Sequence, residues 1–432
     1  MPRFGRHAVC SPLTLASEIG LAVLRDGGNA ADAAIATALA LAVAYPHMCG
    51  VGGDLLAMVW ADGELVGLNS SGRLPAAAEL AADFVPHRGV GSATVPGAPA
   101  GWVSLAERFG TRPLEELAAP VIRLAREGVE RSPGLTRVTS WSEAVLRDDA
   151  EATRIFLADG PLRQPELAAT LAGLAEFYHG PVARAAPPPF TPADFAAHRV
   201  EWVTPLRQAF AGTEVCEMPP NSRGHLVLEA LRRLEPIDGL APDDPALHAR
   251  LVRALHAATF GGDTTYLCCV DGRGMAVSLN QSLFMAFGSG VVVPGTGVLL
   301  HNRAAYLTPA TYRGGARPVH TLSPAMVLAG GKPRLVFGTM GGEGQVQIHL
   351  QLLARILVAG QAPDVAVAAP RWTFDRTTML LEEGLAVDVP SGMMVSPMPA
   401  PEVAGHAHAI LVTTDGLDAG CDPRSDGVAV GD

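Results

Sequence analysis

Apolar residues along the first fifty positions follow the spacing of two helices. Residues 14–26 form the first, and the Gly27-Gly28 pair after it is a common way to end a helix. Asn29 is a suitable N-cap for a second helix that runs to about residue 45. That segment is apolar on nearly every side, which predicts a helix buried between two layers of structure.

Pairs of short apolar segments separated by aspartate or glycine predict β-hairpins. Three such pairs occur: Leu55–Trp60 with Glu64–Asn69, Thr264–Val270 with Met275–Leu279, and Ala325–Leu328 with Arg334–Gly338. A further strand is expected at Ala409–Thr413, and helices at about 98–109, 114–128, 345–358 and, with a Pro-rich break at Ala186–Pro189, through most of 131–200. Helices come first and hairpins later, so we expect an α+β fold with stacked antiparallel sheets covered by helices.

Length and charge narrow the possible functions. The chain has 432 residues, 48% of them hydrophobic, and no linker long enough to separate two domains, so we expect one domain over 1–432. Its net charge of −11 disfavours binding to nucleic acid or to an anionic membrane. The N-terminal stretch has no pattern of a signal peptide, and the apolar run near 33–45 is shorter than a membrane span. We therefore expect a soluble, cytoplasmic protein.

The sequence lacks the residues that several enzyme classes need. Lys332 is the only lysine and lies in a Gly-Gly-Lys-Pro turn, which fits neither a Schiff-base lysine nor a phosphate-binding P-loop. No GxSxG, HExxH or EF-hand pattern occurs, and none of the six cysteines forms a CxxC pair. Nothing in the sequence indicates a metal or an organic cofactor.

A candidate nucleophile stands at the start of the second hairpin. In Asp263-Thr264-Thr265, a cut before Thr264 would give its hydroxyl an adjacent α-amino group as base, with an ordinary pKa of about 7.7–8.0. The flexible Gly261-Gly262 pair directly before it would allow a strained backbone. Taken alone, this stretch is more typical of an ordinary turn into a strand.

Three further positions could complete a site. Gly341-Gly342 lies between a strand and a helix, where converging backbone N–H groups could form an oxyanion hole. Ser282, on the partner strand, could orient the freed amino group, and Arg73 could bind a substrate carboxylate through its fork of donors. A tight turn, an ordinary serine and an ordinary ion pair are the alternative interpretations.

The order of these segments resembles the γ-glutamyltranspeptidase family. The segments that carry the resemblance are ASEIGLAVLRDGGNAADAAIATALALAV, PHMCGVGGD, VPGAPAGWVSLAERFG, MPPNSRG, DTTYLCCVD, FGSGVVVPGTGVLLHNR, RPVHTLSPAMV, GTMGGEGQ and CDPRSDGVAVG. Together they cover roughly residues 7–130 and 201–432, and the part between them only loosely. The order of so many segments is far more specific than any one of them.

Membership would imply an αββα four-layer sandwich of the N-terminal-nucleophile hydrolase type. It would also imply self-cleavage between Asp263 and Thr264, which gives a heterodimer of chains 1–263 and 264–432. The mature enzyme would form an acyl-enzyme on Thr264 and pass the acyl group to water or an amine. Gly341 and Gly342 match the family's oxyanion-hole pair, and Ser282 matches the hydroxyl residue that supports the nucleophile's amine.

The departures from the family concern the substrate. The asparagine that typical γ-glutamyl enzymes carry two residues after that hydroxyl is Phe284 here. The glutamine and aspartate that hold the substrate's α-amino group are Arg303 and Tyr306, and the serine pair that holds its α-carboxylate is His320-Thr321. The site thus gains a cation and apolar bulk, which fits a neutral or anionic acyl group more easily than a zwitterionic glutamyl head. His320 could also be a packed histidine, and Arg303 a structural ion-pair partner.

A second departure concerns processing. The family normally has a further segment between the helix ending near Phe260 and the nucleophile, and almost none of it remains here. The sequence therefore leaves three functions open. The first is a self-processing γ-glutamyltransferase-type enzyme acting on a small amide or γ-glutamyl substrate. The second is an acylase or C–C bond hydrolase with a non-glutamyl substrate, and the third is an unprocessed, inactive relative that acts as a binding protein.

Overall fold

The computed structural model describes residues 2–81, 83–255, 263–375, 377–389 and 391–432. The expected Gly261-Gly262 pair and the helix end near Phe260 lie outside the described residues. The preceding helix, α12, is described over Pro245–Ala254.

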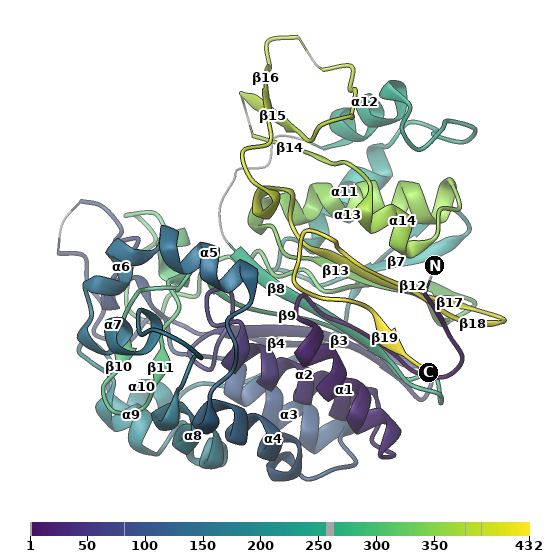
Figure 1. Ribbon diagram of the computed structural model, residues 1–432. Helices are drawn as coiled ribbons and strands as arrows, with labels where there is room; N and C mark the ends of the chain where they lie inside the picture. Colours follow the sequence, from purple (N-terminus) through teal and green to yellow (C-terminus); the bar gives the residue numbers. More distant parts are fainter. Residues whose placement is uncertain (1, 82, 256–262, 376, 390) are drawn as a thin grey trace.

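Two seven-stranded antiparallel sheets are stacked face to face at the centre of the molecule (Figure 1). The first, the β8 sheet, has the order β19 (Val430–Gly431), β2 (Ala8–Cys10), β8 (Asp263–Val270), β9 (Ala276–Phe284), β3 (Asp54–Ala61), β4 (Glu64–Ser70), β5 (Glu201–Val203). The second, the β13 sheet, has the order β1 (Arg3–Phe4), β18 (Gly416–Cys421), β17 (Ala407–Thr413), β13 (Lys332–Thr339), β12 (Ala325–Ala329), β7 (Thr213–Glu217), β6 (Leu206–Phe210).

Helices cover the outer face of each sheet (Figure 1). The β8 sheet carries α1 (Thr14–Arg25), α2 (Ala30–Ala44), α3 (Ala98–Phe109) and α4 (Leu114–Glu127), beside the short helices α5 (Pro133–Trp141), α6 (Glu143–Arg147), α7 (Ala150–Phe156), α8 (Pro165–Ala172), α9 (Pro181–Ala185) and α10 (Pro192–Ala196). The β13 sheet carries α11 (Gly224–Arg233), α13 (Gln345–Leu353) and α14 (Pro363–Ala368). The four layers are those of the expected αββα sandwich.

Two small sheets complete the described fold. They are β10 (Val292–Val293) with β11 (Val298–Leu299), and β14 (Trp372–Phe374) with β15 (Thr378–Leu381) and β16 (Met394–Pro397). The helix expected to continue to Val358 instead ends at Leu353 and passes into a π-helical turn over Ala354–Val358, in which the Ala359 N–H bonds to the Ala354 carbonyl.

The buried helix α2 begins and packs as its sequence predicts. The Asn29 side chain accepts hydrogen bonds from the Ala31 and Asp32 N–H groups, and the Asp32 carboxylate accepts one from the Asn29 N–H. This capping box satisfies donors that a helix start would otherwise leave without partners. All fifteen residues of the helix are buried, in agreement with its uniformly apolar sequence.

Alternation along β8 tells which layer each side chain faces. Tyr266 and Cys268 pack in the core between the two sheets, whereas Leu267 and Cys269 pack beneath the helices. Because side chains alternate along a strand, Thr264 shares the phase of Tyr266 and faces the β13 sheet. The fold thus directs this hydroxyl towards the segment that joins β13 to α13.

Candidate active site

Thr264 lies where the pairing between β8 and β9 is irregular. Asp263 pairs with Phe284 and Thr265 pairs with Gln281, so β9 has one residue more than β8 across this step. Such a bulge bends a strand locally and re-aims a side chain, and bulges are frequent beside active sites. The Thr264 side chain is buried.

The Gly341-Gly342 turn and the start of α13 face this threonine from the other sheet. The side-chain amide of Gln345 lies 3.4 Å from the Thr264 hydroxyl oxygen. Gly341 has a φ of 134° and Gly342 a φ of 53°, backbone conformations that favour glycine. A Cβ at Gly341 would also lie 3.4 Å from the Gly405 Cα, so this turn is closely packed.

Ser282 holds the end of β9 in its unusual conformation. The Phe284 N–H donates to the Ser282 Oγ at 2.7 Å, and Phe284 has a positive φ of 79°. Ser282 is also the register partner of Asp54 on β3. The hydroxyl expected to support the nucleophile therefore lies on the strand beside Thr264, between it and a buried carboxylate.

That carboxylate, Asp54, is the centre of a buried polar cluster that the sequence analysis missed. It accepts hydrogen bonds from the Gly72 N–H and from His320 Nε2, both at 3.0 Å, and lies 3.6 Å from His301 Nδ1. Burial alone would raise the Asp54 pKa, but His301, His320 and Arg303 together hold that pKa below its ordinary value. Asp54 is therefore ionised at neutral pH.

His320 has a hydrogen-bond partner at each ring nitrogen. Nε2 donates to Asp54, and Nδ1 accepts from the Leu322 N–H at 3.4 Å. Burial, with the nearby charge of Arg303, lowers the His320 pKa to about 3, so the ring is neutral. Of the two sequence interpretations, this geometry favours a packed histidine that positions Asp54.

Arg303, Phe284 and Tyr306 lie together next to this cluster. The Arg303 guanidinium lies over the Phe284 ring at 4.2 Å from its centroid, and Tyr306 packs edge-on against the same ring. The Arg303 Nη1 donates to the Thr321 Oγ1 at 3.3 Å. Four predicted substrate-binding residues are thus brought together: Phe284, Arg303, Tyr306 and Thr321.

Glu343 brings a second buried carboxylate to the same region. It pairs with Arg223 at 2.5 Å, and the Arg223 guanidinium also lies over the Tyr306 ring. Burial raises the Glu343 pKa to about 7, against the opposing effect of Arg223 and Arg303. Glu343 and Gln345 both belong to the GTMGGEGQ segment, in which the sequence analysis singled out only the two glycines.

Arg73 lies further out, on the surface. Its Nη1 donates to the Gly315 carbonyl at 3.3 Å, and it lines two neighbouring cavities of about 390 and 560 Å³. Tyr306 lines the larger of these two cavities, together with Arg313 and Arg317. Arg73 therefore shares the lining of this outer cavity with Tyr306.

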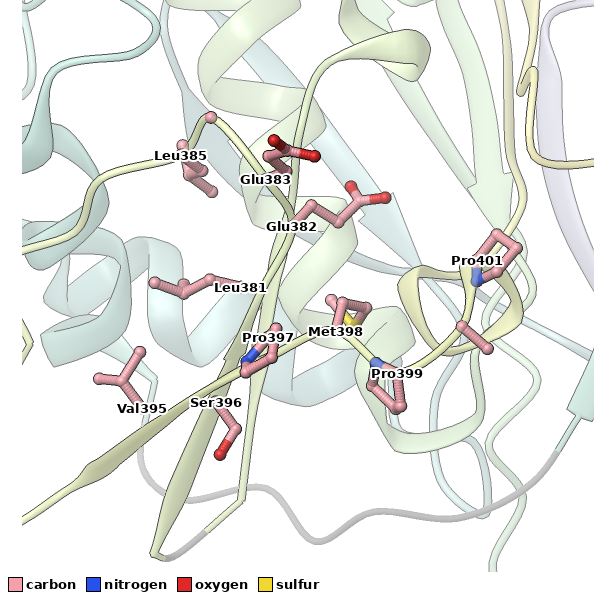
Figure 2. A pocket seen from close by; sticks show the side chains of 12 residues that line it. Leu381, Glu382, Glu383, Leu385, Val395, Ser396, Pro397, Met398, Pro399 and Pro401 are labelled. Carbon is pink, nitrogen blue, oxygen red and sulfur yellow. The ribbon is translucent and has the colours of Figure 1, made fainter.

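A separate cavity of about 750 Å³ lies between β15, β16 and the proline-rich segment that follows (Figure 2). Its walls include Leu381, Glu382, Val395 and Met398, and none of the predicted site residues lines it. Within the described ranges, no group of three or more His, Cys, Asp or Glu side chains is arranged to hold a metal ion. No helix among the same residues is long and apolar enough to cross a membrane.

Comparison with known proteins identifies the family. The sequence profile of the family described as Gamma-glutamyltranspeptidase matches residues 16–260 and 245–432. The chain belongs to the γ-glutamyltranspeptidase family. It is 32% identical to a glutathione hydrolase-like YwrD proenzyme of Bacillus subtilis, over 99% of this chain and 98% of that protein. It is 31% identical to an oxamate amidohydrolase proenzyme of Klebsiella pneumoniae, over 98% of this chain and 97% of that one.

A solved structure supports the same assignment. The crystal structure of cephalosporin acylase from Bacillus halodurans is similar to this γ-glutamyltranspeptidase family member, with a TM-score of 0.90, 29% identity, and coverage of 100% of this chain and 96% of that one. These comparisons confirm the family resemblance, the α+β fold of the N-terminal-nucleophile type and the expectation of an enzyme. The alignment with the Bacillus subtilis protein spans 518 positions, more than the 432 residues of this chain, so that relative carries insertions.

Proposed function

We propose that the protein is a self-processing amide hydrolase or acyltransferase of the γ-glutamyltransferase type, with Thr264 as its nucleophile. The observation that supports this most directly is the position of the Thr264 hydroxyl. It is buried at an irregular strand start and lies 3.4 Å from the side-chain amide of Gln345, three residues after the Gly341-Gly342 turn.

Processing begins with the Thr264 hydroxyl attacking the Asp263 carbonyl carbon. The peptide nitrogen leaves as the new α-amino group of Thr264, and the resulting ester is hydrolysed by water. Chains 1–263 and 264–432 remain together as a heterodimer. The free α-amino group then has a pKa suited to act as general base for the adjacent hydroxyl.

Turnover uses the same atoms on an external amide. The Thr264 Oγ attacks the substrate carbonyl, the N–H groups of Gly341 and Gly342 stabilise the oxyanion, and the amine departs with the proton that the α-amino group took up. Water or an acceptor amine then attacks the ester on Thr264 and releases the acyl group. Ser282 orients the α-amino group in both steps.

The substrate is a small amide whose acyl group is γ-glutamyl or related to it. The named relatives include a glutathione hydrolase-like proenzyme, an oxamate amidohydrolase proenzyme and a cephalosporin acylase, which supports an amide substrate and a two-chain form. We also propose that the protein works in the cytoplasm. Its six cysteines are free thiols, as a reducing compartment favours.

The nucleophile is tested by intact mass under denaturing conditions. Wild type should give two fragments, 1–263 and 264–432, and Thr264→Ala a single chain of 432 residues. Thr265→Ala is the matched control, because it removes a neighbouring buried hydroxyl that faces the opposite layer, and it should still be cut. A single chain in the wild type would refute self-processing and would favour an inactive binding protein.

Substrate class is tested with the processed enzyme. Release of p-nitroaniline is followed from γ-glutamyl, simple acyl and oxamate-type amides at equal concentration, with and without an acceptor dipeptide. Hydrolysis of any of these by wild type, absent in Thr264→Ala, supports the proposal. A processed enzyme that hydrolyses none of these amides would refute the proposal.

A further inference from the structure

Three of the six cysteines meet between the two sheets. Cys10 on β2 and Cys268 on β8 are register partners, and both are fully buried in the core between the sheets. Cys421 is the last residue of β18 in the opposite sheet, packs against the same core, and is only partly buried. All three are free thiols. The fold thus gathers thiols that lie far apart in the sequence, and one of them is partly exposed.

The Cys421 sulfur reaches the backbone beside Cys10. It lies 3.7 Å from the carbonyl oxygen of Ser11, the residue directly after Cys10, and strand β18 packs against β2 at this point. The thiols of Cys10 and Cys421 also act directly on each other's pKa. The two sulfurs therefore approach each other from opposite sheets, which is the first requirement for a disulfide.

The protons of this pair are unevenly held. Burial raises the pKa of Cys10 well above its ordinary value, and hydrogen bonding with Cys268 and Cys421 raises it further. Burial on its own would also raise the pKa of Cys421, but hydrogen bonding from Cys10 and the neighbouring His408 lower it to about 6. At neutral pH, Cys10 is therefore a thiol beside a Cys421 thiolate. The thiolate is the form of cysteine that reacts with oxidants.

His408 is placed to support a negative charge on Cys421. It is the register partner of Cys421 on β17 and is fully buried. Its Nδ1 accepts a hydrogen bond from the Asp422 N–H at 3.3 Å, so the ring proton is on Nε2. Nε2 is buried without a hydrogen-bond partner among the described residues, which leaves its N–H available to the Cys421 sulfur.

We propose that Cys10 and Cys421 form a disulfide when a peroxide reaches Cys421, and that this bond ties the two sheets together. The Cys421 thiolate attacks one oxygen of hydrogen peroxide, the O–O bond breaks, and the products are a sulfenic acid on Cys421 and hydroxide. The Cys10 sulfur then displaces the hydroxyl group from the Cys421 sulfur, and that group leaves with the Cys10 proton as water. The peroxide is the two-electron oxidant, and the two cysteines are oxidised.

In a chain cut before Thr264, this disulfide would also join the two fragments, because Cys10 belongs to 1–263 and Cys421 to 264–432. Formation of the bond does not depend on the proposed activity. Its role as a link between fragments rests on the proposed self-cleavage. Disulfides in a reducing compartment are usually transient, which fits a pair that is reduced at rest and closes under oxidation.

Peptide mapping without reductant tests the bond. Reduced wild type is treated with a small excess of hydrogen peroxide, the remaining thiols are blocked with N-ethylmaleimide under denaturing conditions, and the tryptic peptides are identified by mass. We expect a linked pair of peptides that contain Cys10 and Cys421, absent from untreated protein. Absence of this pair after treatment, or a pair that joins Cys10 to Cys268 in its place, would overturn the proposal.

Variants assign the bond to the two thiols. Cys421→Ser and Cys10→Ala should each abolish it, whereas Cys268→Ala should keep it. Cys269→Ala is the matched control, because Cys269 is the neighbouring thiol on β8 that packs beneath the helices, and this variant should also keep the bond. The wild-type peptide map does not depend on the folding of any variant. Full cross-linking in Cys421→Ser would overturn the assignment.

Denaturing gels separate this inference from the proposed function. If the chain is cut, the fragments of peroxide-treated wild type should migrate as one band without reductant and as two bands with dithiothreitol. A single chain in both lanes together with the linked Cys10–Cys421 peptides means that self-processing fails and the disulfide stands. Two bands in both lanes mean that the disulfide fails and self-processing stands.

Discussion

Replacing Asp54 by asparagine should strongly destabilise the protein, although the change is nearly isosteric. Asp54 is fully buried and accepts two hydrogen bonds at 3.0 Å. It is also the negative charge that does most to stabilise the buried Arg303 cation. An asparagine can still accept one of these bonds. Its NH2 group, however, would meet either the Gly72 N–H or the His320 Nε2–H, donor against donor.

The expected loss of stability follows from removing the negative charge of Asp54. Removing one partner of a buried charged set typically costs about 3–5 kcal/mol, because the remaining charge is left uncompensated. That is a large part of a total stability of about 5–15 kcal/mol. The aspartate pKa is held below its ordinary value, so its contribution is complete at pH 7 and is lost only as the pH falls below about 4.

Urea unfolding followed by the fluorescence of the five tryptophans measures this loss. The matched control is Asp26→Asn, whose exposed carboxylate pairs with Arg112 at 3.0 Å and whose loss should cost at most about 0.5 kcal/mol. Adding Arg303→Met to Asp54→Asn should recover part of the stability, because it removes the uncompensated cation. A loss below about 1 kcal/mol for Asp54→Asn would refute this account of the cluster.

Three further predictions concern the turn, the contact to the nucleophile, and pH. Gly341→Ala should fold but lose most activity, because alanine is strained at a φ of 134°; a normal kcat would contradict the role of this turn. Gln345→Leu should lower kcat/KM about fivefold, the value of one hydrogen bond to Thr264, and an unchanged rate would remove Gln345 from the site. Burial raises the Glu217 pKa to about 6 despite its hydrogen bond to His349. The free energy of unfolding of the wild type should therefore fall by up to about 2 kcal/mol as the pH rises from about 4.5 to above 6. Glu217→Gln should abolish this pH dependence of stability, which melting curves at several pH values measure.

The helices and hairpins were predictable because their patterns are local. The ends of α1, α2 and α3 lie within about two residues of the expected positions, since Gly27, Asn29 and similar residues mark them directly. Strand β9 runs on to Phe284, five residues beyond the expected end at Leu279. The first three residues of this extension, Asn280 to Ser282, are polar yet buried, and hydrophobicity alone cannot distinguish such a segment from a loop.

The site was only partly predictable for a different reason. The resemblance pointed to Thr264 and Gly341-Gly342, which are far apart in sequence, and the fold brings Gln345, three residues after Gly342, to 3.4 Å from the Thr264 hydroxyl. Asp54 and Glu343 were missed, because the importance of a buried carboxylate depends on the partners that the fold brings to it. An aspartate after a glycine pair was the available signal for Asp54, but nothing local indicates two histidines as its neighbours.

The interleaving of strands has a consequence for the protein as an assembly. A cut before Thr264 would divide the β8 sheet so that β8, β9 and β19 belong to one chain while their neighbours β2 and β3 belong to the other. Sheet edges on each fragment alone would be long, apolar and unpaired, a condition that promotes aggregation. Each fragment would therefore depend on the other to cover its exposed strands. If the chain is cut before Thr264, this topology therefore favours folding of the whole chain before that cut.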